Sequence, residues 1–196
     1  LPPCRPTRAP FGTLRFGASA LPLTACTGDQ SAVPFAHGTP DPDCAYVNLG
    51  TGAFIQRPLP TRPADPEPLI GSILCVDEHG PRYSLEGSVN GAGAAVAWFA
   101  GSAGVEESRL WPLLATLADA APLPLFVNGV GGLGSPWWRP AEQALFIGTG
   151  SLAERFGAVV ESIAILVAAN LEAMARRHGP LRRVVVTGGL ARSDWL

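Results

Sequence analysis

The distribution of apolar and polar residues predicts an α/β chain. Short runs rich in apolar and β-branched residues, bounded by glycine, proline or acidic turns, predict strands. Between and after them lie stretches in which apolar residues recur with the 3.6-residue period of a helix. We therefore expect a mixed sheet flanked by helices. The predicted strands are 21–26, 45–49, 53–57, 70–76, 82–85, 123–127 and 183–187.

The four middle strands predict an antiparallel unit. Gly50-Thr51-Gly52 separates the first two as the tip of a hairpin, and the turn at 77–80 separates the last two. The proline-rich stretch 58–68 predicts a loop between the two pairs. We expect these strands to follow one another across the sheet as a four-stranded meander.

A long helix is predicted after Ser151. Ser151 and Glu154 have the spacing of a capping box, and apolar residues at helical spacing follow them. Basic residues and then Gly179 close the segment, as is common at a helix C-terminus. Further helices are predicted at 91–98 and 106–117, and after Gly188-Gly189.

The composition is that of a folded domain without a marked charge preference. The 196 residues are 47% hydrophobic and 15% charged, with a formal net charge of −2. This balance does not favour nucleic acid or an anionic membrane as a partner. The longest apolar stretches are interrupted by Glu161 or Asn170, so we predict no transmembrane helix. We expect a cytoplasmic protein.

The basic residues exclude several kinds of nucleotide chemistry. All 14 are arginine, and the sequence contains no lysine. The Walker P-loop, protein-kinase catalysis and Schiff-base chemistry all require a lysine. A nucleotide would therefore be held by backbone N–H groups, hydroxyls, arginine or a metal ion. The cysteines and histidines have no zinc-type spacing.

Asp29 is the leading candidate for catalysis. It follows the apolar run 21–26 within Thr27-Gly28-Asp29-Gln30, a pattern typical of a strand that turns into a helix. A carboxylate there would point off the end of a sheet, where open α/β folds bind ligands. It could orient a hydroxyl and accept its proton. The alternative is that Asp29 is only an N-cap, contributing about 1 kcal/mol.

Two glycine motifs are candidates for ligand contacts. The hairpin tip Gly50-Thr51-Gly52 could expose N–H groups to an anion, with the Thr51 hydroxyl as a further donor. The alternative is a plain hairpin turn. Gly188-Gly189 could allow a flat ligand to lie against the backbone, or could be a tight strand-to-helix turn.

The order of these motifs resembles the C-terminal domain of the FGGY carbohydrate kinases, and glycerol kinases most closely. The resemblance extends from Pro10 to Leu196. It depends on Thr-Gly-Asp-Gln at 27–30, Gly-Thr-Gly at 50–52, Tyr-Ser-Leu-Glu-Gly-Ser-Val at 83–89, Gly-Ala-Gly-Ala at 91–94, Gly-Leu-Gly-Ser-Pro-Trp-Trp at 132–138, Glu-Ser-Ile-Ala at 161–164 and Gly-Gly-Leu-Ala at 188–191.

The resemblance implies a ribonuclease-H-like fold of the actin-like ATPase type. In this family two domains close on a cleft, and ATP with Mg²⁺ phosphorylates a hydroxyl of a small-molecule sugar or polyol. Residues 1–10 would be a linker from an N-terminal kinase domain absent from this chain. Residues 11–196 would be the C-terminal nucleotide-binding domain, truncated at its C-terminal end. We expect the chain alone not to catalyse, and homo-oligomers are left open.

The resemblance also assigns roles to individual residues. Asp29 matches the catalytic base, and Gln30 matches a substrate contact. Thr51 matches a contact to the nucleotide phosphates. The remaining nucleotide-binding positions are Gly50, Gly52, Gly93, Gly188, Gly189 and Ser193, with Gly189 at the adenosine.

Three positions depart from the glycerol kinase pattern. Ala97 replaces a nucleotide-contacting Gln, and Arg139 and Thr187 each stand where Asp is usual. These departures motivate an alternative function, a catalytically inactive relative that senses a nucleotide or a sugar. A third interpretation is a purely structural α/β domain in which Asp29 is a cap and the glycines are turns.

Overall fold

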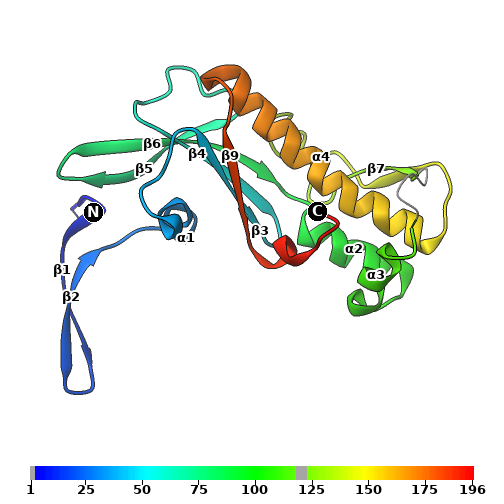
Figure 1. Ribbon diagram of the computed structural model, residues 1–196, viewed down its shortest axis with the longest axis horizontal. Helices are drawn as coiled ribbons and strands as arrows, with labels where there is room; N and C mark the ends of the chain where they lie inside the picture. Colours follow the sequence, from blue (N-terminus) through cyan, green and yellow to red (C-terminus); the bar gives the residue numbers. More distant parts are fainter. Residues whose placement is uncertain (1–2, 118–122) are drawn as a thin grey trace.

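The computed structural model describes residues 3–117 and 123–196. A five-stranded sheet with one long helix along it forms the body, and a two-stranded ribbon projects from the body (Figure 1). The elements are β1 (Arg8–Phe16), β2 (Ser19–Ala25), α1 (Asp29–Ala32), a 3-10 helix η1 (Val33–His37), β3 (Cys44–Leu49), β4 (Ala53–Leu59), β5 (Ile70–Asp77), β6 (Gly80–Val89), α2 (Gly93–Ala103), α3 (Glu107–Leu114), β7 (Leu125–Val127), β8 (Leu145–Ile147), α4 (Leu152–His178), β9 (Arg183–Thr187) and a 3-10 helix η2 (Gly189–Arg192).

The sheet is mixed, as predicted, but its strand order is not that of a meander. The order is β5-β6-β4-β3-β9, with β9 parallel to β3 and the other pairs antiparallel. The predicted meander is therefore wrong, because β6 rather than β5 pairs with β4. The proline-rich loop leads the chain past the position next to β4 and on to the edge of the sheet, where β5 forms. There β5 leaves Ile70 and Ile73 about half exposed, whereas β6 lies between two strands and buries Leu85 and Val89.

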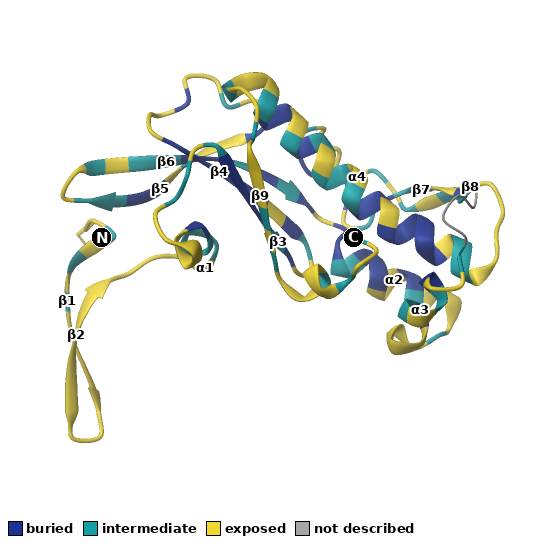
Figure 2. Cartoon of the chain, in the orientation of Figure 1, coloured by how far each residue is buried: buried dark blue, intermediate teal, exposed yellow. Residues whose placement is uncertain are grey.

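The core lies between the sheet and α4 (Figure 2). The inner face of α4 buries Phe156, Val159 and Ile163 completely. The predicted capping box is present, since the Ser151 N–H donates to Glu154 Oε2 at 2.6 Å and the Glu154 N–H donates to Ser151 Oγ at 3.3 Å. By length and composition α4 could cross a membrane. Its contacts with the sheet are those of a core helix.

A buried arginine joins the C-terminal end of α4 to the sheet. Arg57 on β4 is only 3% exposed. Its guanidinium donates to the carbonyl oxygens of Gly179 at 2.7 Å, Pro42 at 2.8 Å and His178 at 2.9 Å. Burial lowers the pKa of Arg57 from its ordinary value. The bonds to His178 and Gly179 satisfy carbonyls that the helix leaves without partners at its end, and the bond to Pro42 ties them to the loop before β3.

Several residues of the sequence motifs form an internal junction between β6 and α4. Ser135 Oγ accepts the Ser88 N–H at 2.6 Å and donates to Asn170 Oδ1 at 2.7 Å. Asn170 Nδ2 returns a bond to the Ser135 carbonyl at 2.9 Å. Asn170 also fills the space in which Gly87 would carry a Cβ. This part of the motif series therefore positions the sheet against the helix.

The N-terminal segment departs from the expected arrangement. The strand predicted at 21–26 forms as β2, but it pairs only with β1 in the ribbon and is not part of the main sheet. Of the stretch predicted as a linker, residues 1–2 lie outside the described residues, and β1 already begins at Arg8. The two strands of the ribbon are joined by a tight turn between the paired residues Phe16 and Ser19, for which Gly17 supplies a positive φ of 58°.

Candidate functional site

A cleft of about 930 Å³ opens beside the end of β3, between α2, α3 and the C-terminal segment. Five of the predicted nucleotide-binding residues line it: Gly50, Thr51, Gly93, Gly189 and Ser193. They come from three separate segments of the chain, so the fold brings together residues up to 143 positions apart. The other lining residues are Leu49, Ala94, Ala97, Glu107, Trp111, Leu114, Ala115, Leu190, Arg192, Asp194 and Trp195.

The floor of the cleft is a tight contact between the β3–β4 turn and the first turn of α2. The Gly93 N–H donates to the Gly50 carbonyl at 2.9 Å, and the Ala94 N–H donates to the Thr51 carbonyl at 2.8 Å. A Cβ atom on Gly93 would lie 2.8 Å from the Gly50 oxygen. Only glycine therefore permits this approach without a shift of the turn.

This contact changes how an anion could be held. The hairpin tip directs carbonyl groups at α2, and the Gly50 N–H donates to the Gly52 carbonyl at 2.9 Å. The first two N–H groups of α2 are also paired with the turn. Thr51 itself is exposed and lines the cleft. The Thr51 hydroxyl is therefore one donor of the turn that lines the cleft, whereas Gly52 packs beside Val89.

The two glycines after β9 have different positions. Gly188 has a φ of 96°, and the space for its Cβ is occupied by the Leu49 carbonyl and by Asn48 Oδ1. It therefore packs on the end of β3 and does not line the cleft. Gly189 begins η2, is exposed and faces the cleft together with Ser193.

Asp29 and Gln30 are not among the residues that line the cleft. Asp29 is the exposed first residue of α1, and its Oδ1 accepts the Gln30 N–H at 2.8 Å. The N-cap position is held by Gly28, so the alternative that Asp29 caps the helix is wrong. Gln30 Oε1 accepts a hydrogen bond from Asn48 Nδ2 at 3.4 Å.

Asn48, which precedes the cleft residue Leu49, contacts Gln30, and the sequence analysis did not identify it. It lies near the end of β3, two residues before Gly50, with its amide between Gln30 and the backbone at Gly188. One signal was present in the sequence. Asn48 is the polar residue in the otherwise apolar strand Cys-Ala-Tyr-Val-Asn-Leu, and a partly buried amide there requires hydrogen-bond partners.

The three departures from the glycerol kinase pattern have different surroundings. Ala97 lines the cleft and leaves space where a longer side chain would reach a ligand. The Thr187 hydroxyl donates to the Val47 carbonyl at 3.3 Å, between two strands of the sheet. Arg139 forms backbone bonds with Leu133 at 2.9 and 3.0 Å. Of the three, Ala97 is therefore the one placed to affect binding directly.

The far side of the cleft has residues that the sequence analysis did not predict. Glu107 and Trp111 come from α3, with the indole Nε1 donating to Glu107 Oε1 at 3.4 Å. Asp194 and Trp195 come from the segment after η2. Within residues 3–117 and 123–196 no group of three or more His, Cys, Asp or Glu side chains could hold a metal ion. A divalent ion would therefore need a ligand's own oxygens.

These features define an α/β domain with a cleft at the end of strand β3, and strand ends are where open α/β folds bind ligands. The family model described as the FGGY family of carbohydrate kinases, C-terminal domain, matches residues 45–196, and the chain belongs to this family. The resemblance inferred from the order of the motifs is thereby confirmed.

Curated relatives and solved structures agree with the family assignment. The chain is 34% identical to a glycerol kinase of Trichlorobacter lovleyi and 32% identical to glycerol kinase 2 of Saccharolobus solfataricus. Both matches cover 100% of this chain but only 41% and 40% of the relative. The chain thus spans about two fifths of the length of these kinases.

Two crystal structures show the same fold. One is a Plasmodium falciparum glycerol kinase with ADP, which has a TM-score of 0.77 and 22% identity over 97% of this chain and 40% of its own. The other is a xylulose kinase from Rhodospirillum rubrum, with a TM-score of 0.77 and 21% identity over 100% and 41%. The predicted actin-like ATPase fold, with a mixed sheet flanked by helices, is confirmed.

Proposed function

We propose that this chain is the nucleotide-binding half of an ATP-dependent sugar or polyol kinase. In this proposal Thr51, with Gly50 and Gly52, contacts the phosphates of ATP. Gly93, Gly188, Gly189 and Ser193 shape the rest of the nucleotide site. Asp29 is the general base for a substrate hydroxyl that Gln30 also contacts. The N-terminal kinase domain of the relatives supplies the remaining substrate contacts, and the cytoplasm is the expected location.

One observation carries the proposal. Five residues assigned to the nucleotide by the motifs line a single cleft, although they come from three separate segments. Asn48, next to the cleft residue Leu49, donates to the side chain of Gln30, which follows Asp29 in the chain. Phosphoryl transfer to an alcohol uses a residue that orients the hydroxyl and accepts its proton, and donors that hold the phosphates.

The chemistry depends mainly on positioning. Phosphoryl transfer needs an aligned hydroxyl and stabilisation of phosphate charge more than covalent help from the protein. Asp29 would accept the hydroxyl proton as the new bond forms, and Gln30 would orient the acceptor. When bound with ATP, Mg²⁺ would supply charge neutralisation; the phosphates would hold it, and Asp29 is the carboxylate expected near it. This chain has no lysine that could hold the phosphates.

The test is an Asp29→Asn variant of the gene's full product, with any region encoded upstream of Leu1 included. We expect kcat to fall by about 10²- to 10⁴-fold, the usual contribution of a general base, while the dissociation constant for ATP stays unchanged. Asp43→Asn is the matched control, because Asp43 pairs with Arg182 at 3.3 Å and does not line the cleft. Unchanged turnover in Asp29→Asn would remove the assigned role.

The second candidate function is a catalytically inactive sensor of a nucleotide or sugar. Ala97 in the cleft is the observation that favours it. A phosphoryl-transfer assay with a panel of polyols and ketoses distinguishes the two functions. ATP binding without transfer to any acceptor would favour the sensor. An absence of ATP binding would favour the third interpretation, a purely structural α/β domain.

A further inference from the structure

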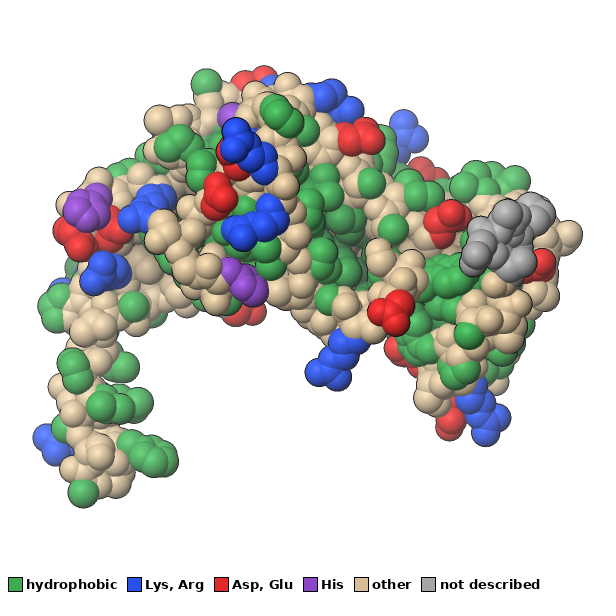
Figure 3. All heavy atoms as spheres, in the orientation of Figure 1, with side chains coloured by type: hydrophobic (Ala, Val, Ile, Leu, Met, Phe, Trp, Pro, Cys, Tyr) green, Lys and Arg blue, Asp and Glu red, His purple; other side chains and the backbone are tan. Residues whose placement is uncertain are grey.

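The cleft beside β3 has an aromatic wall that the proposed phosphate and substrate contacts do not use. Trp111 lines the cleft from α3, together with Glu107 and Ala115 of the same helix. Because these residues are spaced four apart, they lie on one face of α3. Figure 3 shows hydrophobic side chains gathered over the region of α2 and α3, with acidic side chains beside them. A flat indole in such a cleft offers a ligand a surface for stacking.

Two contacts hold the Trp111 ring in place. Its centroid lies 5.3 Å from that of the Phe156 ring, and the two planes meet edge to face at 83°. The indole Nε1 donates to Glu107 Oε1 at 3.4 Å. Phe156 is completely buried in the core, so Trp111 is supported from behind while it lines the cleft. A ring that is already fixed loses little conformational entropy when a ligand stacks on it.

Trp111 and Thr51 lie at different ends of the cleft. The Thr51 carbonyl accepts the Ala94 N–H at 2.8 Å, which places Thr51 at the first turn of α2. Trp111 belongs to an aromatic cluster in which Phe156 stacks on Phe99 at 5.7 Å. Phe99 follows Ala94 by five residues, or about 7.5 Å along the helix. A nucleotide with its phosphates at Thr51 would therefore extend its base toward Trp111.

The side chains at this end of the cleft do not distinguish one purine from another. Ala97 offers a methyl group and no hydrogen bond, and the Ser193 hydroxyl can either donate or accept. The Glu107 carboxylate accepts hydrogen bonds, and adenine and guanine each carry an amino group that can donate one. Arg192 and Asp194 are exposed, so water competes for their hydrogen bonds. Stacking itself is tolerant, since every base has a π-face.

We propose that Trp111 is the stacking wall for the nucleobase and that the cleft accepts ATP and GTP alike as phosphoryl donors. The two fused rings of a purine cover more of an indole than a single pyrimidine ring does. The inference rests on the proposed function, because it takes the cleft as the nucleotide site. It goes further in naming the side chain that holds the base and in widening the class of donor nucleotide.

The test is calorimetry on the gene's full product with ATP, GTP and inorganic tripolyphosphate. We expect the dissociation constants of ATP and GTP to agree within about threefold. Trp111→Leu keeps an apolar cover over Phe156 but removes the flat ring. It should weaken both nucleotides by about 5- to 100-fold and leave the affinity for tripolyphosphate unchanged. Trp111→Phe keeps a flat ring and should restore most of the lost affinity.

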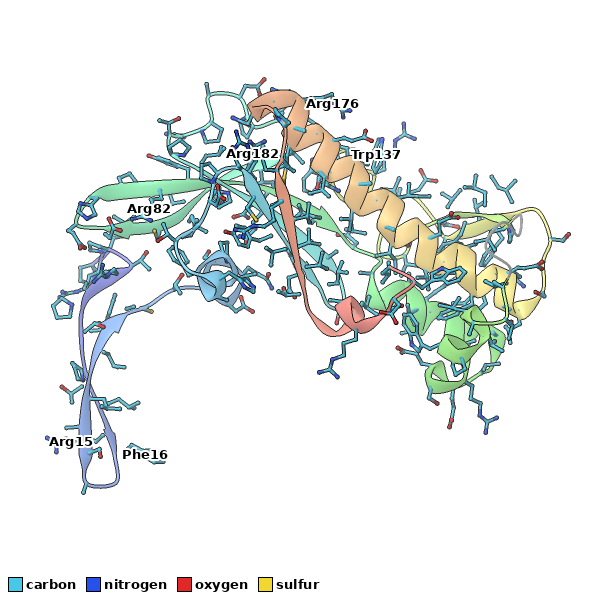
Figure 4. The ribbon with its side chains drawn as sticks, viewed as in Figure 1. Arg15, Phe16, Arg82, Trp137, Arg176 and Arg182 are labelled. Atoms are coloured by element: carbon cyan, nitrogen blue, oxygen red, sulfur yellow. The ribbon has the colours of Figure 1, made fainter. Side chains whose placement is uncertain are left out.

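Trp137→Ala is the matched control. Trp137 is 45% exposed and is not among the residues that line the cleft. In Figure 4 it lies across α4 from α2 and α3. This variant should bind both nucleotides as the wild type does. Thermal unfolding followed by circular dichroism checks that every variant is folded.

Several outcomes would overturn the inference. One is wild-type affinity of Trp111→Leu for both nucleotides, and another is a loss in Trp111→Leu that extends equally to tripolyphosphate or is matched by Trp137→Ala. A third is a wild-type preference of more than threefold for one of the two purine nucleotides. Each of these can arise while the protein still binds ATP, and the proposed function then stands. Wild-type protein that binds neither nucleotide would refute the proposed function as well.

Discussion

Replacing Arg57 by methionine is expected to destabilise the domain far from its cleft. The substitution keeps a flexible apolar side chain but removes the donors that hold the carbonyls of Pro42, His178 and Gly179. Hydrogen bonds to a charged group contribute about 1.5–3 kcal/mol each, and a buried carbonyl left without a donor costs about 1–3 kcal/mol. Gly179 is exposed and His178 half-buried, so water can replace part of the loss. We expect a net destabilisation of about 2–4 kcal/mol.

Urea unfolding followed by far-ultraviolet circular dichroism measures this change. In a domain of this size about 1 kcal/mol corresponds to roughly 2–4 °C in Tm, so a thermal scan should show a drop of about 4–16 °C. Arg109→Met is the matched control, since the Arg109 side chain is 78% exposed and its distance to Glu106 is 3.9 Å. The control should change stability by less than about 0.5 kcal/mol. An unfolding midpoint for Arg57→Met equal to that of the wild type would refute the view that Arg57 anchors α4.

Two further predictions concern the cleft and the pH dependence of stability. Gly93→Ala should displace the β3–β4 turn and weaken ADP binding in calorimetry, because its Cβ would lie 2.8 Å from the Gly50 oxygen. The control is Gly101→Ala in the same helix, whose Cβ meets nothing within 4 Å and should leave ADP binding unchanged. If both variants bind ADP with the same affinity, the tight contact at Gly93 does not shape the site. Burial, with the charges of Arg57 and Arg177, lowers the pKa of His178 below its ordinary value of 6.5. As the pH falls, the unfolded chain therefore takes up a proton at His178 before the folded chain does. The stability contributed by neutral His178 is full above about pH 6.5 and declines below it. His178→Gln should flatten that decline when the free energy of unfolding is measured from about pH 7.5 to about pH 5.

Local sequence patterns predicted the elements well and their long-range arrangement less well. The capping box at Ser151, the helix ending before Gly179 and the β-branched strand at 183–187 depend on neighbouring residues, and all three are present. The order of β5 and β6 depends on where a proline-rich loop leads the chain, which local propensity does not encode. Strand β8 has three residues and no clear period, so it was missed.

The candidate site was predictable only in part for the same reason. Glycine motifs and Asp29 have recognisable local sequence, whereas Glu107 and Trp111 reach the cleft only because α3 packs beside α2. Asn48 carries a weak signal, a polar residue in an apolar strand. To predict that β2 is separate from the main sheet, one would have to know that it pairs with β1, and local sequence does not show this.

The bonds between the β3–β4 turn and α2 have a consequence for how such an enzyme could diversify. Thr51 and Gly93 are tied into one backbone unit, so under the proposed function the phosphate side of the reaction would have little freedom to adjust. Asp29 stands on a four-residue helix outside this unit, next to Gln30, which accepts a hydrogen bond from Asn48 at 3.4 Å. Under the proposed function, the alcohol side could therefore change its residues while the phosphate side stays as it is, so that one rigid phosphate-binding turn could serve acceptors of different shape.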